Sequence, residues 1–409
     1  MAQHIKPKTW LILTQYFPPE IGAPQLRLLA MIKELERQNI KVKVLTAMPN
    51  YPDGEIFEGY KNKFMTTELI DGIETKRMWI YPYNSKSPIL RLLNYFSFTF
   101  TALIGIFRMQ KPDVIFLESQ PLSLGIVALL MKHLKRVPYI YNVPDLQIEM
   151  ANELGYMTNR FFLKLSAAIE TYFMKQSWRV STVTRAFAEH LSERGIEKNK
   201  ITFLPNGADS NFLIPKSPEK NLLSKWNLQG KTIILYVGTH TFYNGFESII
   251  GAAEILKDNK DIVFLMIGSG PERKRIIKIA EQKHLDNMLF EQSPYSERAD
   301  LYSIAYVSLA SLKKIPIFKK VRPAKIFPSL SCGVPVIYAG LGEASDLLQE
   351  NKCGISVEPE NPIALANGIS MLVNNKNLRN KLGDSGRNLI EKQYSWTIIV
   401  DNWLKEIHS

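Results

Sequence analysis

The sequence predicts an α/β protein of two doubly wound domains, each a parallel sheet covered by helices. Three observations support this fold class. The 409 residues exceed what one ordinary core holds. Apolar strand patterns are followed by glycine-bearing loops and then by helical patterns. This series occurs twice, beginning near Thr9 and again near Thr232. We therefore expect residues 1–215 and 216–395 to form two similar domains that face each other across a cleft.

The first series opens with a strand over 9–14, a loop that contains Gly22, and a helix over 25–38 whose leucines follow helical spacing. A strand over 40–46 completes a βαβ unit. Ligands of such sheets lie at the carboxyl ends of the strands, which places Gly22 at the crevice. The loop lacks the G-x-G-x-x-G fingerprint, so a dinucleotide site is disfavoured.

Further strands of this half are expected over 113–117, 139–142, 180–184 and 201–204. Asp145 follows the second of these strands in the segment Val143-Pro144-Asp145. Its position is compatible with a site residue at the sheet edge and equally with a helix N-cap.

The second series has a strand over 232–237, then Gly238-Thr239-His240 and a helix over 246–256. A strand over 262–267 is followed by a second glycine-bearing turn that ends at Arg273. The polar, lysine-rich residues from Asp209 to about Gln229 are expected to be a linker.

The stretch from Val321 to Ile337 predicts a loop, a short helix and a buried strand, with Pro323 in the first helical turn and Gly333 at the helix end. Lys325 then lies beside a helix N-terminus, where unpaired N–H groups favour an anion such as a phosphate. The alternative is a surface lysine near a helix start.

Composition limits the other classes of function. Two cysteines form neither a disulfide framework nor a metal-ligand spacing, which favours a reducing cytoplasm. The first residues do not form a signal peptide. A net charge of +12 needs an explanation, and the candidates are nucleic acid, an anionic membrane or a polyanionic substrate. Between Lys76 and Pro112 six cations and no acid are interleaved with aromatic residues, a composition typical of a membrane-interface surface. Nucleic acid is disfavoured because no reading motif is present.

An apolar run over 92–107 falls short of the roughly 20 residues that span a bilayer. A helix of the domain with one face buried and another available to lipid is favoured over a membrane span.

Taken together, the motifs resemble the retaining, sugar-nucleotide-dependent glycosyltransferases of family 4, closest to the branch that builds bacterial exopolysaccharide and O-antigen repeat units. The resemblance is carried by Y-F-P-P-E-I-G-A-P at Tyr16, P-N-G-A-D at Pro205, Y-V-G-T-H at Tyr236, G-S-G-P-E-R at Gly268, P-A-K-I-F at Pro323, C-G-V-P-V-I at Cys332, G-E-A at Gly342 and Tyr394-Ser395-Trp396. It implies the GT-B architecture: two Rossmann-like domains, the first binding the acceptor and the second the nucleoside diphosphate. It also implies that a last helix over 396–409 crosses back to the first domain.

The resemblance implies that Gly22 and Gly238 let the backbone approach the diphosphate. The arginine and lysine that family members often carry after the second glycine are replaced by Thr239 and Asn244. We expect Lys325 to replace these phosphate cations, with Arg322 or Arg273 as helpers. The two hallmark glutamates of the family are also absent, since Lys320 and Pro328 stand in their places.

Other contacts with the donor must therefore come from elsewhere. Glu343 is a candidate for the hydroxyls of the donor sugar or ribose, or else an ordinary helix-start acid. The uracil is expected near Phe290-Glu291-Gln292, and Asp145 beside the reacting centre. The predicted catalytic residues are Asp145, Lys325 and Glu343, and the predicted donor-binding residues are Gly22, Gly238, Thr239, His240, Arg273, Gln292, Arg322, Lys325, Gly342, Glu343 and Ala344.

The expected activity is transfer of a hexose or N-acetylhexosamine from a UDP-sugar, with retention and without a metal or other cofactor. The expected acceptor is a lipid-linked saccharide, and the expected location is the inner face of the plasma membrane, with peripheral contact. Two alternatives remain: a nucleotide-sugar-binding subunit without transferase activity, and a UDP-sugar epimerase of the same fold.

Overall fold

The computed structural model describes residues 8–20, 22–51, 53–83 and 87–409. The N-terminal segment 1–7, Ile21 of the first loop and Lys86 of the basic-aromatic segment lie outside the described residues. The chain forms two compact units, residues 1–205 with 400–409, and residues 206–399. The sequence predicts domain boundaries after residue 215 and before residue 396, a few residues from those of the two compact units.

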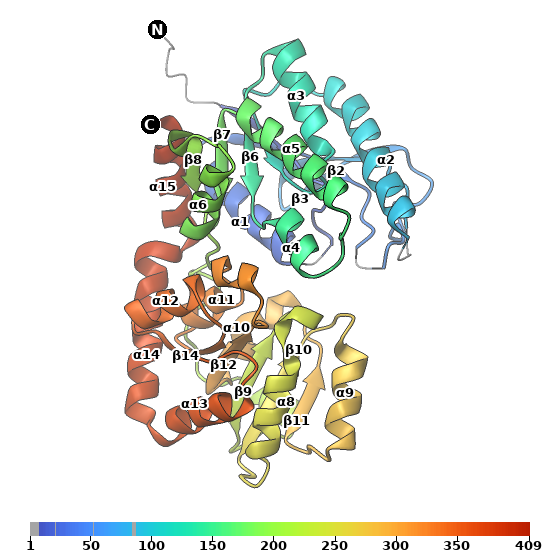
Figure 1. The fold of residues 1–409 in the computed structure, drawn as a ribbon. Coiled ribbons are helices and arrows are strands. Elements are labelled where there is room, and N and C mark those ends of the chain that lie inside the picture. The colour runs from blue at the N-terminus through green and yellow to red at the C-terminus, as the bar shows by residue number, and fades with distance from the viewer. Residues whose placement is uncertain (1–7, 21, 52, 84–86) are drawn as a thin grey trace. The chain divides into compact units, whose positions relative to one another are not determined.

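The first unit contains an eight-stranded sheet in the order β3-β4-β2-β1-β5-β6-β7-β8 (Figure 1). Its neighbouring strands pair in parallel except β3 with β4, which are antiparallel. The strands are β1 Thr9–Leu13, β2 Lys41–Ala47, β3 Met65–Ile70, β4 Ile73–Met78, β5 Val114–Glu118, β6 Tyr139–Val143, β7 Arg179–Thr182 and β8 Ile201–Phe203. The helices are α1 Ala23–Arg37, α2 Pro88–Phe107, α3 Leu124–Lys135, α4 Gln147–Glu153, α5 Arg160–Gln176 and α6 Arg185–Glu193.

The second unit contains a six-stranded, entirely parallel sheet in the order β11-β10-β9-β12-β13-β14. The strands are β9 Thr232–Val237, β10 Ile262–Ile267, β11 Met288–Glu291, β12 Val307–Ser311, β13 Val336–Ala339 and β14 Gly354–Val357. The helices are α7 Lys220–Lys225, α8 Phe246–Ile255, α9 Arg273–Gln282, α10 Arg298–Ser303, α11 Ile326–Ser331, α12 Glu343–Glu350, α13 Pro362–Asn374 and α14 Lys376–Leu389. The last helix, α15 Trp396–His408, begins in the second unit and belongs to the first unit from Val400 onward.

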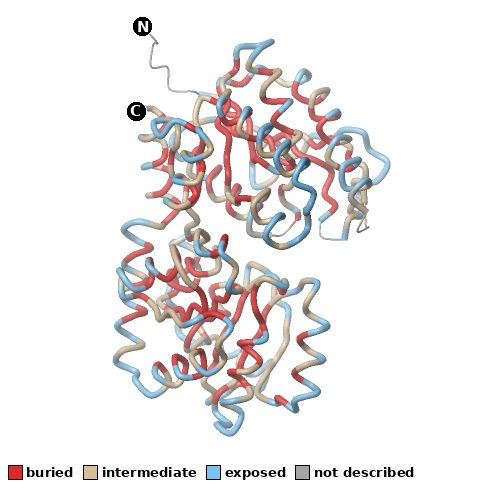
Figure 2. The backbone as a smooth tube through the Cα atoms, in the orientation of Figure 1, coloured by how far each residue is buried: buried red, intermediate tan, exposed pale blue. Residues whose placement is uncertain are grey.

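The central strands β1, β5 and β9 are mostly apolar and buried along nearly their whole length (Figure 2), as expected of parallel strands that are covered on both faces. In each sheet the chain adds strands first on one side of its first strand and then on the other side, and this switch lies between β1 and β5 and between β9 and β12. Such switch points leave a crevice at the carboxyl ends of the strands. The α/β fold class with two doubly wound sheets is confirmed.

Helix α15 completes the core of the first unit after the chain has built the second. The Trp403 side chain is fully buried, with its ring 5.6 Å from the rings of Trp10 and of Phe116. Its indole N–H donates to Ser181 Oγ at 2.8 Å. The buried face of this helix is therefore a structural part of the first sheet.

Two local expectations were wrong. Residues 210–229 are not a free linker, because Leu213 and Leu222 are buried in the second unit and α7 forms there. Helix α11 begins at Ile326, with Lys325 at its N-cap, and so does not include Pro323.

Candidate functional site

The loops that follow β9 and β10 pack so closely that only glycine fits. Gly238 N–H donates to Ile267 O at 3.0 Å, and His240 N–H donates to Ser269 O at 2.8 Å. A Cβ atom on Gly268 would lie 2.0 Å from Gly238 O, and one on Gly270 would lie 2.4 Å from His240 O. The two glycine-bearing turns identified in the sequence therefore form one backbone layer at the carboxyl edge of the second sheet.

Lys325 lies directly against this layer. Its Nζ donates to Tyr236 Oη at 2.6 Å and to Asn244 Oδ1 at 3.1 Å, and it lies 4.3 Å from the centre of the Tyr236 ring. A Cβ atom on Gly238 would lie only 3.3 Å from Nζ. Among the described residues no carboxylate is ion-paired with Lys325. Burial lowers the pKa of Lys325 to about 7, because nothing nearby balances the desolvated charge.

His240 is the second unusual group of this layer. Its imidazole is fully buried between the rings of Tyr236 and Phe246, and neither ring nitrogen has a hydrogen-bond partner among the described residues. Burial, reinforced by the positive charges of Arg273 and Lys325, lowers the pKa of His240 to about 4. The ring is therefore neutral near pH 7 and carries one N–H donor that the protein leaves unsatisfied.

The remaining predicted residues of the second unit occupy neighbouring loops. Arg273 Nη2 donates to Phe290 O at 3.0 Å, which ties the start of α9 to the end of β11. Its buried Nε has no partner in the described chain. Gln292 is exposed just beyond that strand, and Thr239 is exposed while its carbonyl accepts from Tyr236 Oη at 3.0 Å.

Arg322 and Glu343 pair with each other. Arg322 Nη2 lies 2.5 Å from Glu343 Oε2, and its Nη1 donates to Tyr394 Oη at 3.2 Å. Glu343 is the first residue of α12, preceded by Gly342 with φ of 76°. A Cβ atom on Gly342 would lie 2.1 Å from Lys319 O, so glycine is required there, while the Ala344 side chain is buried. The structure thus groups Gly238 and His240 with Lys325, and Arg322 with Glu343.

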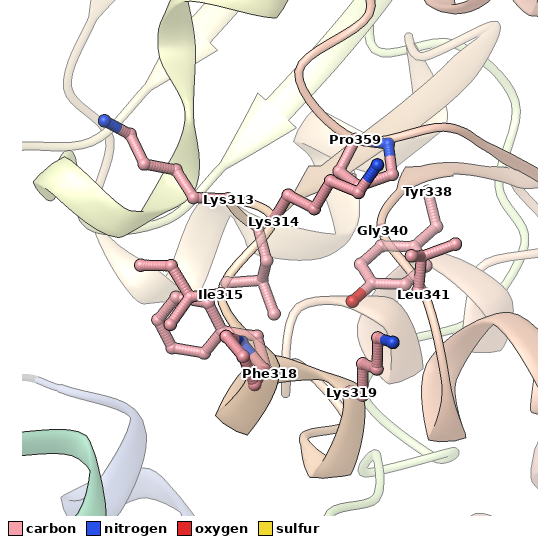
Figure 3. A pocket seen from close by; sticks show the side chains of 11 residues that line it. Lys313, Lys314, Ile315, Phe318, Lys319, Tyr338, Gly340, Leu341 and Pro359 are labelled. Carbon is pink, nitrogen blue, oxygen red and sulfur yellow. The ribbon is translucent and has the colours of Figure 1, made fainter. Parts of the chain in front are cut away.

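A pocket of about 220 Å³ lies at the carboxyl ends of β12 and β13, and its lining includes Lys319, Tyr338 and Leu341 (Figure 3). Tyr338 and Lys319 extend toward the same space from its wall (Figure 3). The Tyr338 hydroxyl is buried and has no partner within the described ranges, which leaves a donor for a polar ligand. The sequence did not indicate this pocket.

The first unit has its own polar cluster at the carboxyl ends of β5 and β6. Arg27 of α1 is buried, with Nη1 3.6 Å from Glu118 Oε1 and Nη2 donating to Leu204 O at 2.9 Å. Asn142 Nδ2 donates to Glu118 Oε1 at 2.8 Å. Burial raises the pKa of Glu118 to about 7 and that of Asp145 to about 6, and the Arg27 charge opposes both shifts.

Asp145 therefore belongs to a cluster rather than acting as a helix cap, because α4 begins at Gln147 with Leu146 at its N-cap. Gly22 lies at the N-cap of α1 in an extended conformation, and a Cβ atom there would meet only the movable side chain of Gln25. Arg27 was missed by the sequence reasoning. A cation on the helix face that carries Leu28 and Ile32 was the available signal.

Within the described ranges no cluster of three or more His, Cys, Asp or Glu side chains is arranged to hold a metal ion.

Comparison with known proteins gives two matching family models. Residues 22–207 match the glycosyl transferase 4-like domain, and residues 219–389 match glycosyl transferases group 1. WcaI of Escherichia coli K12, assigned by name to colanic acid biosynthesis, is 26% identical over 354 residues, 83% of this chain and 86% of that protein.

Two solved structures share the fold. Sucrose-phosphate synthase from Thermosynechococcus elongatus has a TM-score of 0.76 at 17% identity and covers 96% of each chain. HepE of Anabaena, solved with UDP and glucose, has a TM-score of 0.74 at 15% identity and covers 98% of this chain and 100% of that one. The two family models together account for most of the sequence, and the chain belongs to the family 4 type glycosyltransferases of GT-B fold.

Proposed function

We propose that this glycosyltransferase moves a hexose or N-acetylhexosamine from a UDP-sugar, with retention, to a lipid-linked saccharide during synthesis of an exopolysaccharide or O-antigen. The names of its relatives support the pathway class, since WcaI is assigned to colanic acid and CapM of Staphylococcus aureus to capsular polysaccharide. HepE, which shares the fold, was solved with UDP and with UDP-glucose, which supports the donor class.

The observation that carries this proposal is the position of the Lys325 ammonium against Gly238. The diphosphate leaving group gains about one negative charge as its bond to the sugar breaks, and a fixed cation there stabilises that charge. Asn244 stands where family members often have a lysine, and its side-chain oxygen accepts from Lys325 at 3.1 Å. We infer that Lys325 brings a positive charge to the position of the usual lysine from a different segment, and so compensates for Asn244.

The unsatisfied donor of His240 supports a ligand at the same layer, because a buried N–H without a partner costs roughly 1–3 kcal/mol until it is bonded. We assign it to a phosphate or sugar oxygen of the donor. Glu343 and the neighbouring pocket are assigned to the hydroxyl groups of the donor. In this proposal Lys325 and the His240 N–H stabilise the negative charge of the leaving diphosphate, as a metal ion does in other transferases.

In the first unit we assign Asp145 to the polar group beside the reacting centre, with Arg27 holding its charge. Asp145→Asn removes the charge with little change of shape. We expect turnover to fall strongly while UDP affinity stays nearly unchanged, because the residue belongs to the acceptor-binding unit. An unchanged turnover number would remove Asp145 from the site.

The decisive experiment measures UDP release from a panel of UDP-sugars without acceptor, followed by transfer assays in which the anomeric configuration of the product is read by NMR. Slow hydrolysis of one donor, and a product of retained configuration, would support the proposal. Tight binding of a UDP-sugar without hydrolysis or transfer would instead indicate a binding subunit, which the loss of both hallmark glutamates to Lys320 and Pro328 makes the competing outcome.

A further inference from the structure

Helix α2 exposes many large apolar side chains to solvent. On its buried side Asn94 donates to Tyr81 O at 2.6 Å and accepts from Gln15 Nε2 at 3.1 Å, and Thr101 donates to Trp79 O at 2.6 Å. Large apolar side chains on the other side are 46% to 75% exposed: Ile89, Leu92, Leu93, Phe96, Phe100 and Phe107. A surface helix of a domain surrounded by water normally places polar residues on its outer face. Helix α2 instead carries apolar residues on its outer face as well as on its buried face.

Helix α5 also exposes large apolar side chains, which the sequence analysis did not predict. Its outer face carries Phe161, Phe162, Leu165, Ile169 and Tyr172, which are 38% to 68% exposed. The spacing of these residues places them along one side of the helix. The opposite side is buried and includes Phe173 and Met174.

The two exposed faces belong to one layer of the first unit. Helix α3 packs against both α2 and α5, and Figure 1 shows the three helices side by side. Leu134 of α3 is 63% exposed, and Lys135 Nζ of the same helix lies 5.9 Å from the centre of the Phe107 ring of α2. We define these exposed residues of α2, α3 and α5 as the α2–α5 surface.

The charged residues of the α2–α5 surface indicate what it binds. Exposed cations accompany the apolar residues: Arg91, Arg108, Lys135, Arg136, Arg160 and Lys164. The three helices contain a single acid, Glu170, and it is buried against Arg194 at 2.7 Å. An apolar surface flanked by cations and free of exposed acids matches an anionic bilayer, whose acyl region takes the apolar side chains and whose phosphates pair with Arg and Lys.

We propose that the α2–α5 surface lies flat on an anionic membrane, with α5 as the second contact element beside α2. By length and composition the segment Ile89–Phe107 is also the one candidate membrane span in the described chain, and 39% of it is buried. Spanning would break the hydrogen bonds of Asn94 and Thr101 to the rest of the unit, so α2 stays docked and only its outer face meets lipid. Membrane contact by the α2–α5 surface is a property in addition to the proposed catalysis. Its link to the proposed function is that a lipid-linked acceptor resides in the same membrane.

The test is flotation of the full chain with phosphatidylcholine vesicles that contain or lack phosphatidylglycerol, without donor or acceptor. Phe161→Ser with Phe162→Ser should weaken binding to the anionic vesicles about 30-fold, which corresponds to about 2 kcal/mol at 1.4 kcal/mol per tenfold. The matched control is Ile363→Ser with Met371→Ser, which removes two exposed apolar residues of α13 in the second unit. This control should bind like the wild type.

A second variant tests the proposal independently, in case the first variant does not fold. Arg160→Glu with Lys164→Glu changes only exposed side chains and should abolish the preference for phosphatidylglycerol. Wild-type flotation by both α5 variants would overturn the proposal, and so would retention of the protein in vesicles after an alkaline carbonate wash, which marks a spanning segment. Because no substrate is present, failure here leaves the proposed transfer reaction standing, and loss of transfer activity leaves membrane binding measurable.

Discussion

Replacing Lys325 by methionine tests the proposed donor site most directly, because it removes the ammonium and keeps the length of the side chain. A hydrogen bond between charged groups contributes about 1.5–3 kcal/mol. That range corresponds to a UDP dissociation constant roughly 10- to 150-fold higher for Lys325→Met at a pH where Lys325 is charged.

The size of the effect should depend on pH in a defined direction. The pKa of Lys325 is about 7 in the ligand-free protein, and a bound diphosphate raises it, so binding takes up a proton above pH 7. The UDP dissociation constant of Lys325→Met divided by that of the wild type should therefore be largest at pH 6 and should decrease as the pH rises above 7. Taking this ratio cancels the titration of UDP itself.

Isothermal titration calorimetry with UDP at pH 6, 7.5 and 9 measures this ratio. Lys278→Met, at an exposed position of α9, changes the net charge equally and should leave the affinity unaltered. The lowered pKa of Lys325 also means that the ligand-free folded protein gains stability as pH rises from about 7 toward 10.5. Lys325→Met should therefore unfold no earlier than wild type at pH 6, which separates lost binding from lost folding. A ratio near one at pH 6, or one that grows with pH, would refute the assignment.

Three further predictions concern packing and the first unit. Arg27→Met should lower the free energy of unfolding in urea by about 1–3 kcal/mol, because it leaves the Leu204 carbonyl without its donor and removes the charge that opposes the raised pKa of Glu118; adding Glu118→Gln should recover part of this loss, and strictly additive losses would contradict the pairing. Gly268→Ala should weaken UDP binding, because the new methyl would meet a backbone oxygen at 2.0 Å, whereas Gly368→Ala, whose nearest neighbour at 3.3 Å is a side-chain methyl, should bind UDP normally. Trp403→Phe should lower the free energy of unfolding by about 1–3 kcal/mol, because the smaller ring leaves space beside Trp10 and Phe116 and removes the indole donor from two hydroxyl groups that otherwise bond only to each other and to a backbone carbonyl; an unchanged urea midpoint would refute this prediction.

The fold was accessible from the sequence wherever a strand is buried on both faces. The strands over Thr232–Val237 and Ile262–Ile267 coincide with their apolar runs residue for residue. The β3–β4 hairpin was missed because its strands alternate with polar residues. Asp71-Gly72 was an available signal, since both residues have positive φ, 48° and 86°, as a tight hairpin turn requires.

The site was accessible only in part, for a different physical reason. Loop glycines and Lys325 follow strand and helix patterns that local sequence displays. The partners that fix their chemistry do not, because Lys325 and Tyr236 are 89 positions apart and Arg27 and Asn142 are 115 apart. Neither the low pKa of His240 nor the unsatisfied Tyr338 hydroxyl has any signature in a single segment, since both arise from burial by several elements.

The return of the chain to its first sheet affects the order in which the protein can fold during synthesis. Domains usually fold as units in the order in which they leave the ribosome. Here the core around Trp10 and Phe116 lacks Trp403 until almost the whole chain has emerged, and an unfilled indole site of that size leaves a large destabilising cavity. The unit that is made first is thus completed last, and a nascent chain arrested before α15 should carry a folded second unit beside an unfinished first one.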